Sequence, residues 1–344
     1  MELTPRKQAI LAAIVKYHIA TGSPVGSKWL TTSLENAPSS ATLRNEMSQL
    51  SNMGLLYQPH TSAGRIPTGK GYEFYVSNLM KSNEIGEREK AFIDTTLEKS
   101  NADSEILPTL AAKLLSKITG LPAFVAKVAD ESAVIKRVQI MPMSSHLIMT
   151  AISTSDGRTK SKLCRSASPI SEGEIAGLYR LIKECVEGKP LYELSAAAMQ
   201  NMYAQTGLDA LSLMPLIASL FDMIKEMGQS QIQFSGEMNI YSMLESSEKA
   251  GKLISFLERK EGIMSLISQQ KDSVGVIFGG ETGFSELSKA TVIVAPYGPK
   301  NLKMGRIGVI GPTRMSYAEI VPGISYLAER LTEILNESIK DMEE

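Results

Sequence analysis

The first 70 residues contain three short helical patterns followed by a strand and a polar loop, and this order restricts the fold more than any other feature. Thr4 as N-cap, Pro5 at the first helical position and Gly22 after the last turn delimit the first helix. The segments "SKWLTTSL" and "SSATLRNEMSQLSNMG" predict two further helices that are closely joined. A "LLYQ" strand, the loop and a returning "RIPT" segment complete the order of a winged helix-turn-helix.

The third predicted helix has one apolar stripe and an opposite face of short polar residues. Leu43, Met47 and Leu50 recur at the spacing i, i+4, i+7 and predict the buried side. The opposite side is rich in Arg, Asn and Gln, which make bidentate contacts with guanine and adenine edges in a major groove. A merely solvated helix face, which usually favours Glu and Lys, is the alternative interpretation. We expect this region to contact DNA through Ser39, Ser40, Thr42, Arg44, Asn45 and Gln49.

The loop "PHTSAGRIPT", residues 59–68, has the composition of a DNA-contacting wing. We expect Gly64 to adopt a positive φ at the hairpin tip, with Arg65 next to it contacting phosphate or a minor groove. Pro67 lacks a backbone donor, so the returning strand is expected to be an edge strand. An ordinary surface hairpin is the alternative interpretation. The expected DNA contacts of this loop are His60, Thr61, Ser62, Gly64 and Arg65.

The distribution of charge favours a nucleic-acid partner for the N-terminal block. Residues 1–80 include seven basic and four acidic residues, a net charge of +3. The other 29 basic and 33 acidic residues give the rest of the chain a net charge of −4. The N-terminal block is therefore the part of the chain that is suited to approach a phosphate backbone.

The remainder of the chain predicts a linker and a strand-rich domain that a helical block interrupts. Residues 1–80 form the expected DNA-binding domain, and the charged residues 81–103 predict a linker helix. An amphipathic helix and β-rich runs follow in residues 104–158, where "SDGR" signals a hairpin. Residues 159–234 are mainly helical, and strands resume in residues 235–344 before a closing helix. We expect an α+β multidomain fold with the helical block as an insertion.

The sequence lacks the residues that several classes of function require. The three histidines, His18, His60 and His146, are scattered, and no motif for nucleophilic catalysis or for a phosphate-binding loop occurs, which argues against an enzyme. Two cysteines outside any CxxC or Cys/His cluster predict neither a disulfide framework nor a metal site. No apolar run is long enough to span a membrane, and the N-terminus lacks signal-peptide features, so we expect a cytoplasmic protein without cofactors.

Four segments resemble those of a known family. "PVGSKWL", "SSATLRNEMSQLSNMGLL", "PHTSAGRIPTGKGYEFYV" and "GRIGVIGPTRMSY" are similar, in this order, to segments of the HrcA family of bacterial heat-inducible transcription repressors. The resemblance runs over nearly the whole chain. It implies an N-terminal winged helix, a GAF-like α/β domain and a helix-rich dimerisation domain inserted into the latter. The chain departs from many members at Glu73, where a basic residue is common, and at Ser51 and Asn52, where acidic residues are common.

The resemblance also implies partners. Family members bind the CIRCE inverted repeat, a double-stranded DNA operator of groE- and dnaK-type chaperone operons, as homodimers, and the chaperonin GroEL promotes their active form. We therefore expect a bacterial repressor that leaves its operator on heat stress. The alternative is a winged-helix regulator whose GAF-like domain senses a small metabolite, although the sequence reveals no convergent polar residues for such a ligand.

Overall fold

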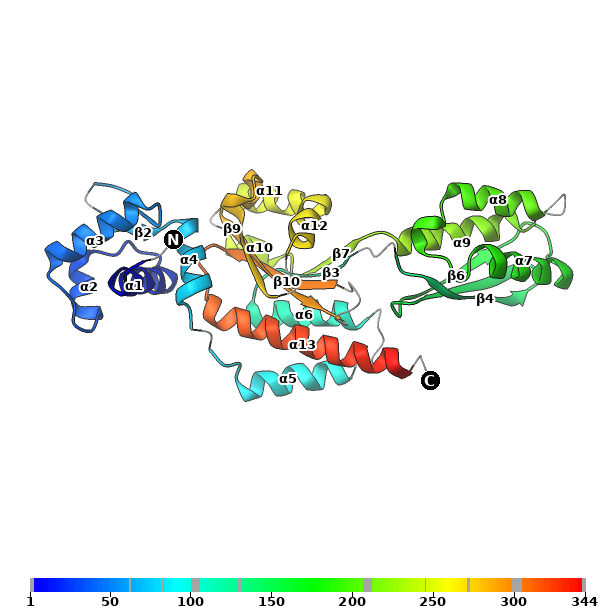
Figure 1. The fold of residues 1–344 in the computed structure, drawn as a ribbon, viewed down its shortest axis with the longest axis horizontal. Coiled ribbons are helices and arrows are strands. Elements are labelled where there is room, and N and C mark those ends of the chain that lie inside the picture. Colours follow the sequence, from blue (N-terminus) through cyan, green and yellow to red (C-terminus); the bar gives the residue numbers. More distant parts are fainter. Residues whose placement is uncertain are drawn as a thin grey trace.

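The computed structural model describes residues 3–61, 63–81, 83–99, 106–128, 132–206, 212–244, 246–270, 273–298 and 305–341. Its fold mixes α-helices and β-strands in three units that follow one another along the longest axis of the molecule (Figure 1). An N-terminal helical unit lies at one end, a unit with a five-stranded sheet lies in the middle, and a unit with a three-stranded sheet lies at the other end.

The N-terminal unit contains four helices and a two-stranded hairpin. They are α1 (Pro5–Thr21), α2 (Ser27–Ser33), α3 (Ser40–Asn52), β1 (Leu56–Tyr57), β2 (Ile66–Pro67) and α4 (Gly69–Phe74), which a π-helical turn over Tyr75–Leu79 extends. Local capping sets the ends of α1, as the sequence predicts. The Thr4 hydroxyl accepts from the backbone N–H of Lys7, and Gly22 follows the helix in the left-handed conformation with a φ of 71°.

The middle unit is built on a five-stranded antiparallel sheet with the strand order β7-β3-β10-β9-β8. The strands are β3 (Ala123–Lys127), β7 (Gln231–Ser235), β8 (Gly275–Phe278), β9 (Ala290–Tyr297) and β10 (Gly305–Pro312). Strand β3 lies between β7 and β10, which come more than a hundred residues later in the sequence. The other four strands of this sheet therefore follow the inserted unit in the sequence, and only β3 precedes it.

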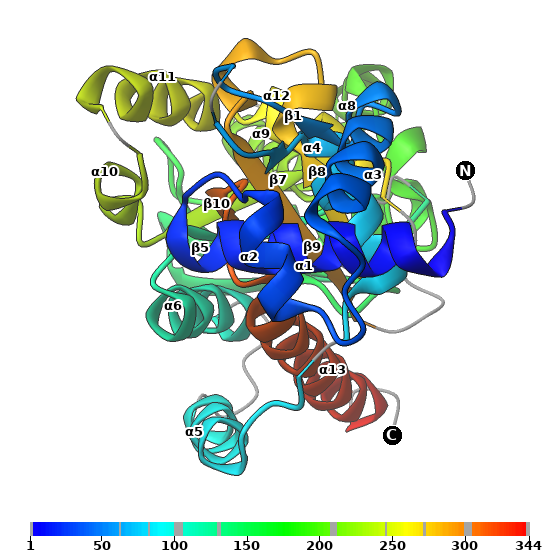
Figure 2. The ribbon, with the colours of Figure 1, turned by 90° about the vertical axis from the view of Figure 1, so that its left-hand side faces the viewer.

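Helices cover both faces of this sheet (Figure 2). On one face lie α6 (Leu107–Thr119) and α13 (Tyr317–Asp341), and on the other lie α10 (Asn239–Met243), α11 (Ser247–Glu258) and α12 (Glu261–Ser268). The expected linker contains α5 (Glu87–Glu98), which packs against α13. Arg330 Nε lies 2.9 Å from Asp94 Oδ1, and Ile93 is buried, so this helix is part of the folded core.

The unit at the far end has its own hydrophobic core. An antiparallel sheet of β4 (Ile135–Ser144), β5 (Leu147–Thr154) and β6 (Thr159–Arg165) packs with one face on α7 (Glu172–Cys185), α8 (Ala196–Thr206) and α9 (Met214–Met227). Ser171 forms the capping box of α7 with Glu174, as the Ser-x-x-Glu pattern suggests. Hydrogen bonds from Ser212 and Ser171 hold the pKa of the Glu174 carboxyl at about 2.

Strand pairing corrects the expected boundaries of the insertion. The expected cut between residues 158 and 159 falls inside the β5–β6 hairpin, in which Ser153 pairs with Thr159. Strand β7, which we placed in the insertion, pairs with β3 of the middle sheet. The inserted unit therefore includes β4 and β5 and ends before β7. A strand pattern predicts that a segment is extended but not which sheet it joins, and the expected start at residue 104 lies outside the described residues.

Candidate nucleic-acid interface

The outer face of α3 is exposed, and the buried stripe that the sequence predicts is confirmed. Leu43, Met47 and Leu50 lie in the core of the N-terminal unit. The Ser39 hydroxyl caps the helix by accepting from the backbone N–H of Thr42 at 3.2 Å. The side chains that face solvent along the helix are Ala41, Arg44, Asn45, Ser48, Gln49 and Asn52. This face offers guanidinium and amide groups and contains no carboxylate.

Polar contacts hold Arg44 against the start of α2. Arg44 Nε donates to Ser27 Oγ at 3.2 Å, and Ser27 Oγ lies 2.8 Å from Ser40 Oγ. Ser27 is buried, and it does not cap α2 because Gly26 occupies the N-cap position. The contact uses one of the five guanidinium N–H groups, so the planar end of Arg44 can still reach a base edge. The Ser40 hydroxyl is thus paired with Ser27, and it reaches the arginine only through that serine.

Gly64 does not adopt the positive φ that the sequence analysis assigned to it. It lies where the loop passes very close to the backbone between α1 and α2. Val25 and Arg65 form a β-bridge in which each backbone N–H donates to the other residue's carbonyl at 2.9 Å. A Cβ atom on Gly64 would lie 2.2 Å from the Val25 carbonyl oxygen. Glycine is therefore required by the close approach of two backbones.

Arg65 was expected at the tip of the loop, and this placement is wrong. Its backbone belongs to the bridge with Val25 at the base of the hairpin, and its side chain is half-buried. Its Nε is buried and has no hydrogen-bond partner among the described residues. The loop of residues 59–68 therefore has its cation near its base and not at its tip.

The tip of the loop is a turn of polar residues without a lysine or arginine. The Ala63 N–H donates to the His60 carbonyl at 2.9 Å, and His60 and Thr61 are exposed. The Gln58 side chain braces this turn by donating to the carbonyls of Thr61 and Ala63 at 2.9 and 2.8 Å. The sequence analysis missed Gln58, because glutamine is not one of the residue types that are typical of turns. Ser62 lies outside the described residues.

Glu46 neutralises part of the positive charge of this unit. Its carboxylate lies 3.2 Å from Lys7 Nζ and 3.9 Å from Arg6 Nη1, so it links α3 to the start of α1. Exposed lysines remain on α1, α2 and α4 at Lys16, Lys28 and Lys70. These cations add to the positive charge that the N-terminal unit presents to solvent, and Lys70 lies near the carboxylates of Glu73 and Glu281.

Arg314, in the segment "GPTRM", joins the N-terminal unit to the middle unit. Its Nη1 donates to the carbonyl of Ile19 at 3.5 Å, at the C-terminal end of α1 where the helix dipole favours a cation. The ring of Tyr72 in α4 lies beside that of Tyr317 in α13, with centroids 6.1 Å apart. The sequence analysis assigned no role to this arginine. These contacts give the N-terminal unit a defined orientation to the middle unit.

Lowering the pH below about 6.5 is expected to weaken the N-terminal unit through His18. Burial, together with the positive charge of Arg314, lowers the pKa of His18, whose Nδ1 lies 2.6 Å from the Tyr72 hydroxyl. The unfolded chain then binds a proton more readily than the folded one, so stability declines as the pH falls from 6.5 through the folded pKa. Urea unfolding followed by the fluorescence of Trp29 measures this effect. His18→Gln should reduce it, whereas His60→Gln in the exposed loop should not.

Neither a metal site nor a membrane-spanning helix occurs among the described residues. No group of three or more His, Cys, Asp or Glu side chains among them could hold a metal ion. Within the same part of the chain, none of the helices is both long enough and apolar enough to cross a membrane.

Comparisons with known proteins agree with the resemblance seen in the sequence. Residues 107–321 match the family model described as the C-terminal domain of HrcA protein. The "heat-inducible transcription repressor HrcA" of Acetivibrio thermocellus is 30% identical over 339 residues, which cover 97% of this chain and 96% of that protein. Its counterpart in Lachnoclostridium phytofermentans is 32% identical over 341 residues, with 97% and 98% coverage.

A solved structure has a similar overall fold. The crystal structure of a hypothetical protein aligns with 98% of this chain and 100% of its own chain, with a TM-score of 0.63 and 24% sequence identity. The likeness extends over all three units, so their succession along the chain also occurs in an experimentally determined molecule.

Proposed function

Because the chain belongs to the HrcA family of heat-inducible transcription repressors, we propose that it represses groE- and dnaK-type chaperone operons in the bacterial cytoplasm by binding the CIRCE inverted repeat. The observation that carries the proposal is the exposed face of α3, with Arg44, Asn45 and Gln49 on one side of a well-capped helix. We assign residues 3–80 as a winged helix-turn-helix, in which α3 enters the major groove and residues 59–63 contact the DNA backbone. The relatives are repressors and not enzymes.

A footprint of the purified protein on the chaperone promoters of its own genome tests this function. We expect protection of an inverted repeat, with each half-site covered by one N-terminal unit. If no chaperone promoter were protected with or without chaperonin, the proposed function would be wrong.

Replacing Asn45 by alanine is expected to lower operator affinity by about 1–3 kcal/mol and to relax specificity at one position of each half-site. The reason is that a buried adenine edge would lose its amide partner, whereas contacts to phosphate would remain. Binding titrations with operator and random DNA measure the change. Asn52→Ala, in the last turn of α3, is the matched control and should have little effect. Equal losses on operator and random DNA would show that Asn45 does not read a base.

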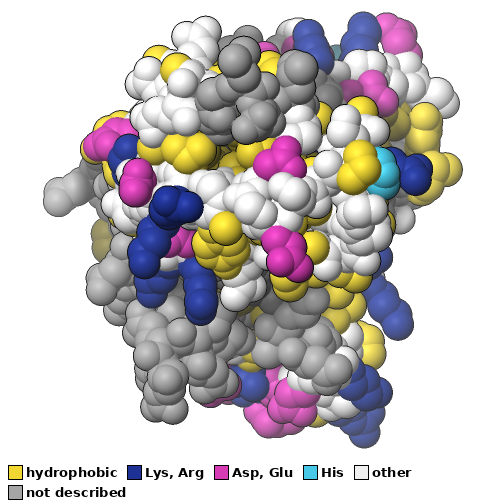
Figure 3. Space-filling model, turned by 90° about the vertical axis from the view of Figure 1, so that its right-hand side faces the viewer, with side chains coloured by type: hydrophobic (Ala, Val, Ile, Leu, Met, Phe, Trp, Pro, Cys, Tyr) yellow, Lys and Arg dark blue, Asp and Glu magenta, His cyan; other side chains and the backbone are white. Residues whose placement is uncertain are grey.

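We further assign the inserted unit as the dimerisation domain, since an inverted-repeat operator calls for two-fold symmetry of the protein. One face of its sheet packs on helices, while the other has Met141, Met149 and Leu163 in a row across the three strands. Hydrophobic side chains also lie among charged ones on the far end of the unit (Figure 3). Among the described residues of this unit, the large exposed hydrophobic side chains are Met143, Leu163, Tyr179, Tyr192 and Met214. Such a surface suits burial against a second copy.

We also propose that heat regulates the repressor: it loses its active form on heating, and the chaperonin GroEL restores that form. The middle unit, assigned as GAF-like, connects the DNA-binding face with the dimerisation domain. Operator binding that recovered fully after heat shock without chaperonin, and that excess chaperonin did not change, would exclude this regulation. The alternative function, a regulator that senses a metabolite, has support from a cavity beside the five-stranded sheet.

A further inference from the structure

Two junctions connect the proposed dimerisation domain to the proposed DNA-binding face. An inverted repeat is read by two copies of α3, so the distance and the angle between these helices decide which spacing of half-sites fits. In each chain this geometry passes from the inserted unit through the middle unit to the N-terminal unit (Figure 1). The first junction lies between the inserted and middle units, and the second lies between the middle and N-terminal units.

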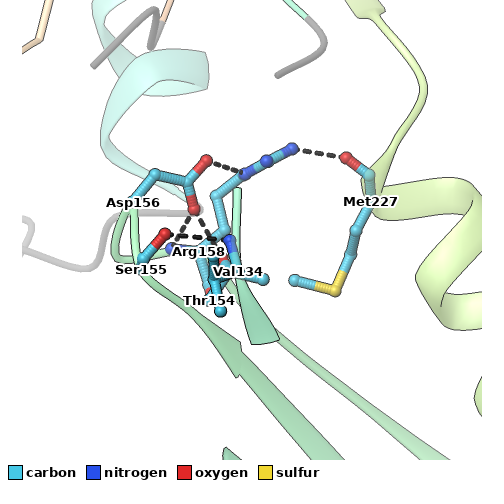
Figure 4. A network of polar contacts seen from close by, with 6 residues as sticks. All are labelled: Val134, Thr154, Ser155, Asp156, Arg158 and Met227. Atoms are coloured by element: carbon cyan, nitrogen blue, oxygen red, sulfur yellow. Dashed lines mark hydrogen bonds and ion pairs between the residues drawn. The ribbon is translucent and has the colours of Figure 1, made fainter. Parts of the chain in front are cut away.

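At the first junction, one turn holds both connections of the inserted unit (Figure 4). The chain enters this unit at Val134 and leaves it after Met227, and the turn between β5 and β6 contacts both. The Ser155 N–H donates to the Val134 carbonyl at 2.8 Å, and the Val134 N–H donates to the Ser155 hydroxyl oxygen at 3.0 Å. Arg158 Nη1 donates to the Met227 carbonyl, while its Nε lies 2.5 Å from Asp156 Oδ2. The inserted unit therefore has a braced base.

The second junction contains a row of four rings from both units. His18 of α1 and Tyr72 of α4 belong to the N-terminal unit, whereas Tyr317 of α13 and Phe278 of β8 belong to the middle unit. Ring centroids are 6.1 Å apart between His18 and Tyr72, and also between Tyr72 and Tyr317. The centroids of Tyr317 and Phe278 are 6.0 Å apart. Tyr72, Tyr317 and Phe278 are buried in one hydrophobic core, so apolar packing holds the two units together.

Arg314 adds a charged contact to the second junction. Its Nη1 donates to the Ile19 carbonyl at the end of α1, where the helix dipole favours a cation. Gly22 makes room for the guanidinium, because a Cβ atom there would lie 2.8 Å from Arg314 Nη1. The segment that contains Arg314 is itself braced, since the Tyr317 hydroxyl donates to the Thr313 carbonyl at 2.7 Å. Arg314 therefore holds the end of α1 against a well-supported loop of the middle unit.

We propose that Arg314 is a positioning residue that determines which spacing of operator half-sites the dimer accepts. This inference rests on the proposed function. Arg314 acts through α1, which packs against α3 and so carries that helix at a fixed angle to the middle unit. A junction that turned freely would let two copies of α3 adapt to several spacings, whereas a fixed junction favours one spacing and binds it more tightly.

Arg314→Ala and Arg314→Glu in the full chain test the proposal, and both should fold because Arg314 is exposed. Glutamate places a negative charge at the carbonyl end of α1, so it should loosen the junction more than alanine does. We expect Arg314→Glu to lower affinity for the inverted repeat about tenfold. Adding or removing a few base pairs between the half-sites should then change affinity less than it does for the unaltered chain. Affinity for DNA with a single half-site should stay unchanged, because α3 is intact.

Time-resolved anisotropy of Trp29 fluorescence measures the second junction without DNA. Trp29 is the single tryptophan of the chain, and its ring centroid lies 4.4 Å from that of Tyr17 within the N-terminal unit. In the unaltered chain the anisotropy should decay with the tumbling of the whole molecule. Arg314→Glu should add a faster phase, because the N-terminal unit then moves independently. Arg314→Lys keeps a cation at the end of α1 and should resemble the unaltered chain in both experiments.

Arg88→Glu is the matched control, because Arg88 is exposed on α5 and the replacement changes the charge of the chain by the same amount. It should alter neither the spacing dependence nor the anisotropy decay. The proposal is overturned if Arg314→Glu keeps the full spacing dependence, binds the inverted repeat more tightly, or shows no faster phase. If the unaltered chain bound neither the inverted repeat nor a single half-site, the proposed function itself would be wrong, and this inference would fail with it.

Discussion

Gly64→Ala is expected to destabilise the N-terminal unit by about 2–4 kcal/mol and to lower operator affinity about tenfold or more. The added Cβ would lie 2.2 Å from the Val25 carbonyl oxygen and 2.4 Å from the carbonyl carbon, and these are backbone atoms that cannot rotate away. Relief of the clash separates Val25 from Arg65 and breaks the two hydrogen bonds that fix the base of the loop. Urea unfolding and operator titrations measure the two effects.

Two features of the unit make this experiment specific. Trp29 in α2 is the single tryptophan of the chain, so its fluorescence follows unfolding of the N-terminal unit. Gly69→Ala is the matched control, because a Cβ on Gly69 would meet nothing within 4 Å and Gly69 begins α4 in the same unit. If both alanine variants unfolded at the same urea concentration, the close approach at Gly64 would not matter for stability.

Features that depend on neighbours in the sequence could be predicted. Thr4 and Gly22 delimit α1, Ser39 caps α3, and the buried stripe of α3 follows from the helical repeat of its leucines and methionine. Each depends on a hydrogen bond or a periodicity within a few residues. The exposure of Arg44, Asn45 and Gln49 followed from the same periodicity, and that is why the face proposed to bind DNA was recognisable.

Features that depend on distant partners could not be predicted. Gly64 was expected to need a positive φ, but the requirement comes from Val25, which lies far from it in the sequence. The place of Arg65 at the base of the hairpin follows from the same bridge. Tyr297 of β9 and Lys127 of β3 lie in one row of the sheet because both pair with Gly305 of β10, which runs between their strands. A pattern along the chain contains no information about such neighbours.

Deleting the inserted unit, which we propose to be the dimerisation domain, is expected to leave the chain monomeric and to lower operator affinity about 100-fold or more, while the N-terminal unit stays folded. Lys127 and Gln231 are paired in β3 and β7, so residues 129–229 can be replaced by Asn-Gly to give a two-residue hairpin between Val128 and Ser230. The hydrophobic core of the inserted unit shares no residue with the cores of the other two units. Sedimentation gives the assembly state, and operator titration gives the affinity.

A second deletion variant separates loss of dimerisation from damage to the DNA-binding face. In it, the Asn-Gly turn is kept and a two-stranded parallel coiled coil is joined to the C-terminus through a flexible linker, so that two copies are again held together. This variant should recover part of the lost affinity, because linking two half-site contacts raises their effective concentration. In both deletion variants the urea midpoint followed by Trp29 should stay unchanged, since that residue packs on Tyr17 within the N-terminal unit. A deletion variant that remained dimeric, or that bound the inverted repeat as tightly as the full chain, would place the dimer contact outside the inserted unit.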